Sequence, residues 1–262
     1  MAEYLLDNAW RQARERLAAL EASLDPGTIR HLDALGVAAG WRCLEVAGGG
    51  GSIAAWLGHR VGPRGHVLAT DLDPRFLAAL AAPNLAVRRH DIVTDDLPAG
   101  RFDLVHARSL LLHLPERARA LARMVAALRP GGWLLVEEQD FVSRVPDPAA
   151  VDAALVARCE RAWQQHVRGR GMDPAYGRRL YGEVRARGLV ELGSEGRVQM
   201  VRGGTPEARV QRLGFTQMRD GLLGTGLVSA AELDRFLALH DEPGAVWLGP
   251  ITMAVWGRRP AR

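Results

Sequence analysis

The pattern of apolar and polar positions predicts a strand, a glycine turn and a helix near residue 50. An apolar run from Trp41 to Val46, too short for a buried helix, leads toward four consecutive glycines. Helical spacing of apolar residues then resumes at Ser52. Because glycine has no Cβ, such a turn lets the backbone approach a ligand at the N-terminus of the helix. This arrangement is typical of a nucleotide site.

A carboxylate follows the next apolar run, Val67–Thr70. It belongs to Asp71, at a position from which a carboxylate accepts hydrogen bonds from both ribose hydroxyls. The segment Gly49–Ala54 fits G-x-G-x-x-A, so the turn alone is compatible with a nicotinamide dinucleotide. Glu45 favours S-adenosylmethionine instead, because a carboxylate suits the ammonium group that this cofactor carries and a pyrophosphate lacks.

Strand and helix patterns alternate from Trp41 to Glu138, which predicts a parallel sheet with helices on both faces. The helix after His113 has its apolar residues at i, i+3, i+4 and i+7 and is expected to pack on the sheet. Later strands are expected near Leu189–Val201 and Ile251–Trp256. The predicted fold class is α/β, with a Rossmann-like, seven-stranded, mostly parallel sheet.

Helical patterns flank this core. One predicted helix runs from Tyr4 to Leu24, a break follows at Asp25–Gly27, and a second helix runs from Thr28 to Leu35. A capping box at Ser229–Glu232 opens another helix. We therefore expect four regions: an N-terminal helical cap (1–36), a cofactor-binding α/β core (37–141), a helical lid insertion over the substrate (142–188), and the C-terminal part of the core sheet with helices (189–262).

Five motifs in order resemble those of the class I S-adenosylmethionine-dependent methyltransferases of the small-molecule type. The first, E/D-x-G-x-G-x-G, is matched by Glu45–Gly51, with Ala47 in place of the first glycine. The second is the ribose-binding acid and the residue after it, Asp71-Leu72, and the third contains the adenine-binding acid and its neighbour, His90-Asp91-Ile92. The fourth is the fourth strand, Phe102–Arg108, and the fifth is the turn into the fifth strand together with that strand, Leu128–Glu138.

The resemblance implies a cofactor and a set of residues that bind it. The cofactor is S-adenosyl-L-methionine. In the third motif, Asp91 would accept from the adenine amine and Ile92 would pack on the ring, while the backbone of Arg108 would line the cofactor. The implied cofactor-binding residues are Glu45, Ala47, Gly49, Gly51, Asp71, Leu72, Asp91, Ile92 and Arg108.

Charge and composition narrow the choice of substrate. The formal charge is +4 and lysine never occurs, which excludes lysine Schiff-base chemistry. The arginines alternate with acids along predicted helices, as solvated faces do, and form no basic stripe for nucleic acid. The fourth strand is followed by Ala107-Arg108-Ser109, not by the Asn/Asp-Pro-Pro-aromatic motif of nucleic-acid amino-methyltransferases. We expect a small-molecule substrate and no nucleic-acid partner.

The sequence shows no membrane span, secretory leader or metal-ligand pattern. Cys43 and Cys159 are isolated, so both are expected to be reduced and buried, without a disulfide or a zinc ion. We expect a cytoplasmic protein, monomeric or homodimeric, that has no membrane partner and needs no metal.

Methyl transfer to an alcohol or phenol is helped by a general base, and His113 is the best-placed histidine, just after the fourth strand. A histidine at this point can equally hold the loop together. The side chain of Arg108 fits either an acidic ligand or a salt bridge across the loop. Candidate substrate contacts are amphipathic side chains of the cap and the lid: Tyr4, Trp10, His166, Tyr176 and Tyr181.

The function predicted from the sequence is therefore methyl transfer from S-adenosylmethionine to an oxygen or nitrogen atom of a small, largely apolar molecule, such as a secondary metabolite. Proteins that use the same cofactor without transfer, for cyclisation or hydroxylation, are one alternative. A cofactor-binding protein without catalysis, or a nicotinamide enzyme, is another.

Overall fold

The computed structural model describes residues 5–149 and 151–261, and the chain divides into two compact units. Unit 1 contains Met1–Ser23, Gln139–Ala175 and Arg197–Thr252. Unit 2 contains Leu24–Glu138, Tyr176–Gly196 and Met253–Arg262.

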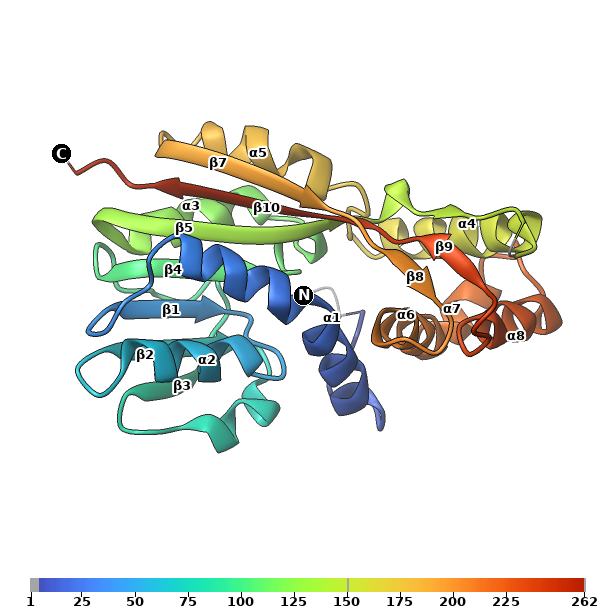
Figure 1. Ribbon diagram of the computed structural model, residues 1–262, viewed down its shortest axis with the longest axis horizontal. Coiled ribbons are helices and arrows are strands. Elements are labelled where there is room, and N and C mark those ends of the chain that lie inside the picture. Colours follow the sequence, from blue (N-terminus) through green and yellow to red (C-terminus); the bar gives the residue numbers. More distant parts are fainter. Residues whose placement is uncertain (1–4, 150, 262) are drawn as a thin grey trace. The chain divides into compact units, whose positions relative to one another are not determined.

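The seven-stranded sheet, which centres on unit 2, confirms the predicted fold class. Four adjacent pairs among its first five strands in sheet order are parallel, and β10 runs opposite to β7 (Figure 1). The strand order is β3 (Leu85–Arg89), β2 (His66–Asp71), β1 (Arg42–Val46), β4 (Phe102–Arg108), β5 (Leu128–Asp140), β10 (Ile251–Arg258) and β7 (Val190–Arg197).

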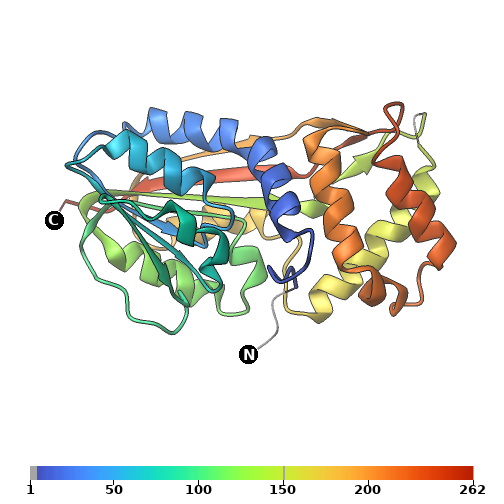
Figure 2. The same ribbon diagram turned by 90° about the horizontal axis from the view of Figure 1, so that it is seen from below.

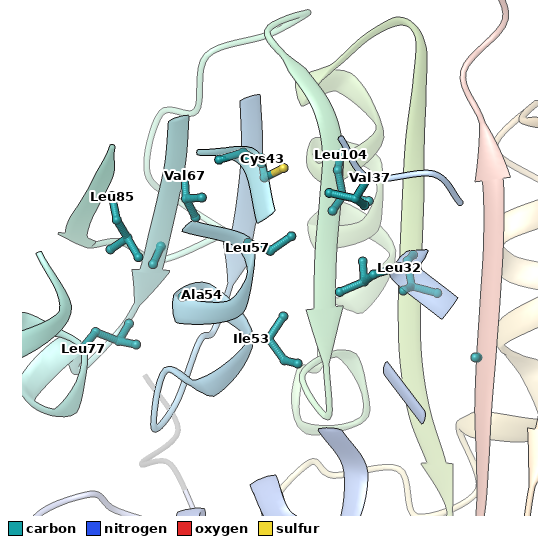
Figure 3. Packing of buried hydrophobic residues seen from close by; sticks show 14 residues of the cluster. Leu32, Val37, Cys43, Ile53, Ala54, Leu57, Val67, Leu77, Leu85 and Leu104 are labelled. Carbon is teal, nitrogen blue, oxygen red and sulfur yellow. The ribbon is translucent and has the colours of Figure 1, made fainter. Parts of the chain in front are cut away.

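Helices cover both faces of this sheet. Helix α2 (Ser52–Val61) lies on one face and α3 (Arg117–Ala127) on the other (Figures 1 and 2). A further helix of unit 2 is α5 (Gly177–Arg185). The apolar residues of α2 recur at helical spacing, so they form one stripe against the strands. Figure 3 shows this packing, in which Ile53, Ala54 and Leu57 of α2 share a buried cluster with side chains of neighbouring strands.

One predicted break is wrong. Helix α1 is continuous from Ala13 to Ala34 and contains Pro26, whereas we expected two helices separated at Asp25–Gly27. A proline inside a helix removes a backbone hydrogen bond and is unfavourable by about 3 kcal/mol. Tertiary contacts on the C-terminal side oppose this penalty, because Thr28 and His31 both bind the buried Glu137. Such contacts cannot be seen in a local pattern.

Unit 1 is built from helices and a small sheet. The helices are α4 (Ala153–Gly169), α6 (Pro206–Gln217), α7 (Arg219–Leu223) and α8 (Ala230–Leu239). The capping box at the start of α8 is confirmed. The antiparallel sheet, which the sequence did not predict, has the order β6 (Val145–Pro146), β9 (Val246–Leu248) and β8 (Met200–Arg202).

Aromatic side chains form much of the core of unit 1. The ring of Phe215 packs edge-on against Phe236 at 4.8 Å, and Phe141 packs against Trp163 at 5.1 Å. The buried guanidinium of Arg144 lies 4.8 Å from the Trp163 ring and pairs with Glu160 at 2.6 Å. The predicted lid insertion is thus divided, because α4 belongs to this unit and α5 to unit 2.

Candidate functional site

The glycine turn lies between β1 and α2 in unit 2. Three of its residues have positive φ angles: Ala47 (56°), Gly49 (56°) and Gly51 (95°). Gly51 is the N-cap of α2, and its N–H donates to the carbonyl of Gly48 at 2.9 Å. A Cβ on Gly51 would overlap the side chain of Leu80. The turn therefore needs glycine at Gly51 for its backbone angle and for the residues packed around it.

Ala47 is strained where it replaces the first glycine of the motif. A left-handed conformation costs an L-residue about 1–2 kcal/mol, and glycine avoids this cost. We expect Ala47→Gly to raise the free energy of unfolding by about 1 kcal/mol. Ala55→Gly, inside α2, is the matched control and should lower it by about 1 kcal/mol. Urea denaturation measures both, and a destabilised Ala47→Gly variant would contradict the assignment of strain.

Asp71, at the end of β2, is bonded directly to the glycine turn. Its Oδ2 accepts from the N–H of Gly49 at 3.0 Å, and its Oδ1 accepts from the N–H of Asp73 at 3.0 Å. Burial raises the pKa of Asp71, and these backbone hydrogen bonds oppose the rise. Each carboxylate oxygen has two lone pairs, so both can still accept from ribose hydroxyls. The next residue, Leu72, is exposed.

Asp91 follows β3, the strand adjacent to β2, so it lies toward the same end of the sheet as Asp71. Its Oδ1 accepts from the N–H of Val93 at 2.8 Å, which closes a short turn. The side chain of Ile92 is buried. The third motif therefore lies at the carboxyl ends of the parallel strands, where open α/β sheets bind ligands.

The side chain of Arg108 binds helix α1. Its guanidinium donates to Asp25 Oδ1 at 2.9 Å and to Thr28 Oγ1 at 2.8 Å. Ser52, the first residue of α2, donates to the same Asp25 oxygen at 3.0 Å. The structure thus favours the salt bridge over the binding of an acidic ligand. Arg108 joins the end of β4 to α1.

A buried chain of ionisable groups, which sequence reasoning missed, lies beside the turn. Glu45 on β1, His106 on β4 and Glu137 on β5 come from three adjacent strands and are all buried. His106 Nδ1 lies 2.6 Å from Glu45 Oε2, and its Nε2 lies 3.4 Å from Glu137 Oε2. Glu137 also accepts from Thr28 at 2.5 Å and contacts His31 Nδ1 at 3.2 Å.

His106 and Glu137 shift each other's pKa in opposite directions. Burial alone would lower the pKa of His106, but the carboxylates of Glu45 and Glu137 outweigh it and raise that pKa to about 9. Burial would raise the pKa of Glu137, and hydrogen bonds from His106 and His31 instead bring it well below its usual range. At neutral pH, His106 is therefore a charged imidazolium that lies between the buried side chains of Glu45 and Glu137.

Glu138 holds the loop that contains His113. Its carboxylate accepts from the N–H groups of Leu110 (3.0 Å), Leu111 (2.6 Å) and Leu112 (3.2 Å). His113 ends the short helix η3 (Leu111–His113) that these bonds fix. The predicted base is therefore on a well-supported loop, and sequence reasoning missed the residue that supports it.

The pKa of Glu138 gives a testable pH dependence. Burial raises it to about 7, against the three backbone donors. The folded pKa is above the unfolded value of about 4.3. The stability contributed by the protonated carboxyl is therefore complete below about pH 4.3 and is lost as the pH rises through 7. Relative to Glu138→Gln, the native chain should lose roughly 3 kcal/mol of unfolding free energy between pH 4.5 and pH 8. Guanidinium denaturation of both proteins measures the difference, and parallel pH curves would contradict it.

The five candidate substrate residues do not all lie in one unit. Tyr4 is outside the described residues, Trp10 and His166 belong to unit 1, and Tyr176 and Tyr181 belong to unit 2. The ring of His166 occupies the space that a Cβ on residue 221 would need, which indicates a packing role.

The two tyrosines of unit 2 differ in exposure. Tyr176 is buried, with the guanidinium groups of Arg117 and Arg179 at 5.3 Å and 5.7 Å from its ring. Its hydroxyl has no hydrogen-bond partner among residues 5–149 and 151–261. Tyr181, on α5, is 37% exposed and can contact a ligand directly.

Other expectations concern metals, thiols and membranes. Within the described part of the chain, no cluster of three or more His, Cys, Asp or Glu residues could hold a metal ion. Cys43 and Cys159 are free and buried, as predicted. Among the helices of residues 5–149 and 151–261, none has the length and apolar character needed to cross a bilayer.

Comparison with known proteins identifies the motif-bearing region. Residues 44–134 match the family model described as a methyltransferase domain. Methyltransferase str3 of Strobilurus tenacellus is 28% identical over 174 residues, covering 63% of this chain and 59% of that protein. The ubiquinone/menaquinone biosynthesis C-methyltransferase UbiE of Pseudomonas putida is 34% identical, covering 39% of this chain and 43% of its own. The matches thus span about half the length of these relatives.

A solved structure extends the likeness to nearly the whole chain. Phosphoethanolamine N-methyltransferase 2 of Haemonchus contortus, in complex with S-adenosylhomocysteine, aligns with 99% of this chain and 61% of its own, with a TM-score of 0.61 and 14% identity. At that identity the likeness concerns the fold, which agrees with the seven-stranded sheet. Residues 44–134 therefore match a methyltransferase domain, and the solved methyltransferase structure shares the fold of the chain.

Proposed function

We propose that unit 2 binds S-adenosylmethionine at the carboxyl ends of β1, β2 and β3, and that the chain transfers the methyl group to an oxygen or nitrogen atom of a small, largely apolar molecule. The hydrogen bond between Asp71 Oδ2 and the Gly49 N–H, at 3.0 Å, carries this proposal. It joins the ribose-binding acid to the glycine turn, so the two parts of a nucleotide site are held together before any ligand binds.

The residues present fit this cofactor. Asp71 retains lone pairs for the ribose, and Asp91 lies toward the same end of the sheet for the adenine amine. One oxygen of the buried Glu45, Oε1, has no hydrogen-bond partner in the part of the chain that the structure describes, and an ammonium group would satisfy it. When bound, the cofactor supplies a methyl group on a cationic sulfur atom.

The remaining chemistry falls to positioning and proton transfer. An in-line displacement requires the nucleophile about 3 Å from the methyl carbon, opposite the sulfur, with water excluded. We assign His113 as the general base for a hydroxyl or amine nucleophile, since histidine titrates near the working pH. The support that Glu138 gives to the η3 loop favours this role.

The acceptor and the setting of the protein are proposals of the same kind. A secondary metabolite is the acceptor class we favour, with no role for nucleic acid, in a cytoplasmic monomer or homodimer. Substrate contacts are proposed for Tyr4, Trp10, His166, Tyr176 and Tyr181, and the exposure of Tyr181 supports its inclusion. The lid role of residues 142–188 remains a prediction.

Incubation with isotopically methyl-labelled S-adenosylmethionine and a panel of phenols and amines tests the transfer. We expect label in an acceptor, and His113→Gln should lower kcat by about 100-fold or more with little change in cofactor affinity, because general-base catalysis contributes a factor of that size. If the cofactor binds but no label moves with any acceptor, the transfer proposal is contradicted, and cyclisation or hydroxylation becomes the better assignment.

A further inference from the structure

His106 is held at both ring nitrogens in the interior of unit 2. Nδ1 lies 2.6 Å from Glu45 Oε2 and Nε2 lies 3.4 Å from Glu137 Oε2. An ionised carboxylate only accepts hydrogen bonds, so the ring must carry a proton on each nitrogen to satisfy both acids. None of the His106 side chain is exposed, and both acids are also buried. Three adjacent strands thus converge on one imidazolium ion.

Glu137 is fixed from other directions as well. Its Oε2 accepts from the hydroxyl of Thr28 at 2.5 Å, and its Oε1 contacts Nδ1 of His31 at 3.2 Å. Thr28 also accepts from Arg108 at 2.8 Å. Because Glu137 has these further partners on α1, it provides a fixed point that orients the His106 ring toward Glu45.

Glu45 has one satisfied and one available oxygen. Oε2 is bound to His106, whereas Oε1 has no hydrogen-bond partner among residues 5–149 and 151–261. The side chain lies under the glycine turn, with its Cγ 3.5 Å from the place where a Cβ on Gly48 would stand. Oε1 is therefore the Glu45 oxygen that can accept a hydrogen bond from a ligand.

We propose that His106 is a positioning residue for the cofactor: held between Glu137 and Glu45, it orients the Glu45 carboxylate so that Oε1 binds the α-ammonium group of the cofactor. This inference rests on the proposed cofactor site. Glu137 on β5 is the charged group that contacts the His106–Glu45 pair, at 3.4 Å from His106 Nε2, and Glu137 is in turn influenced by His31 on α1 and Arg108 on β4. Without the imidazolium, two buried carboxylates would share the interior of the sheet, and a proton would occupy one of them.

The experiment compares two ligands that differ at the amino-acid end. S-Adenosylhomocysteine carries the α-ammonium group, and 5′-methylthioadenosine lacks the whole amino-acid moiety while keeping the nucleoside. By calorimetry on the full chain, His106→Gln should weaken S-adenosylhomocysteine by roughly 10-fold to 100-fold, the range for a hydrogen bond to a charged group. Its affinity for 5′-methylthioadenosine should change by less than about 2-fold, because no ammonium group is present.

Two variants at the same position separate positioning from simple damage. In His106→Asn the side-chain amide nitrogen would stand near the place of Nδ1 and can donate to Glu45. In His106→Gln the amide nitrogen would stand near the place of Nε2 and can donate to Glu137 only. His106→Asn should therefore recover part of the affinity for S-adenosylhomocysteine that His106→Gln loses. Equal loss for both ligands, or equal affinities in all three proteins, would overturn the inference.

Asp71→Asn tests the cofactor site independently. It should weaken both ligands by the same factor, because both carry the ribose. If Asp71→Asn affects neither ligand, the proposed cofactor site is at fault; if it affects both while His106 variants affect neither, only the role of His106 is wrong.

A measurement on the native chain remains decisive if the His106 variants fail to fold. Titrations between pH 6 and pH 8 in buffers of different ionisation enthalpy count the protons released on binding. We expect the same count for the two ligands, because the raised pKa of His106, about 9, keeps its ring protonated in the free chain and in both complexes. Release of about one additional proton with S-adenosylhomocysteine would show that the His106–Glu45 pair changes its protonation when the ammonium group binds, and would overturn the proposal.

Discussion

Replacing Glu137 by Ala is expected to lower the free energy of unfolding by about 3–5 kcal/mol, the range measured when one partner of a buried ion pair is removed. Glu137 binds Thr28, His31 and His106. Its loss leaves the imidazolium of His106 with one carboxylate instead of two, and leaves the Thr28 hydroxyl without its acceptor. Urea denaturation at pH 6.5 measures the change.

The pH dependence of that loss identifies its cause. The pKa of His106 is raised to about 9 from an unfolded value near 6.5, so the stability that its proton contributes is complete below about 6.5 and is lost as pH rises through 9. The difference between the native chain and Glu137→Ala should therefore shrink from pH 6.5 to pH 10. Glu195→Ala is the control, because Glu195 also faces His31 but is exposed, and it should cost less than about 1 kcal/mol. If Glu137→Ala also lowers the free energy of unfolding by less than about 1 kcal/mol, the stabilising role of the buried network is refuted.

Replacing Asp71 by Ala is expected to weaken S-adenosylmethionine by about 1.5–3 kcal/mol, the contribution of hydrogen bonds to a charged group. Two effects act together. The ribose hydroxyls lose their acceptor, and the N–H of Gly49 loses the carboxylate that fixes the turn. Calorimetric titration of S-adenosylmethionine measures the loss in affinity.

Asp73→Ala is the matched control for this substitution. Asp73 lies two residues along the chain, and its carboxylate pairs with Arg75 at 2.7 Å instead of with the glycine turn. We expect no more than about a 2-fold change in affinity for this variant, since exposed ion pairs contribute little. Unchanged affinity in Asp71→Ala would remove the ribose assignment.

The alternating core of the fold was predictable because its signals are local. Glycine turns, apolar runs and helix stripes place β1 to β5, α2 and α3 without tertiary information. The continuity of α1 through Pro26 was not predictable, because contacts from Thr28 and His31 to a residue more than 100 positions away oppose the local break. The sheet of β6, β9 and β8 was missed because strands of two or three residues carry no measurable periodicity.

The candidate site was predictable where a motif carries it. Glu45, Asp71 and Asp91 were found from spacing and resemblance, and the structure places each at or near the end of a neighbouring strand. His106, Glu137 and Glu138 were missed because their importance depends on strand register. A signal was present, since charged residues near the carboxyl ends of three predicted buried strands must find partners across the sheet. In the parallel pairing of β1 with β4, Glu45 lies directly opposite His106.

The crystal structure of the chain with S-adenosylhomocysteine tests the central claim most directly. We predict the ribose hydroxyls within hydrogen-bond distance of Asp71, the adenine amine at Asp91 and the α-ammonium group at Glu45 Oε1. Nucleotide bound away from the Gly48–Gly51 turn, or a chain that binds NAD there and not S-adenosylhomocysteine, would contradict it.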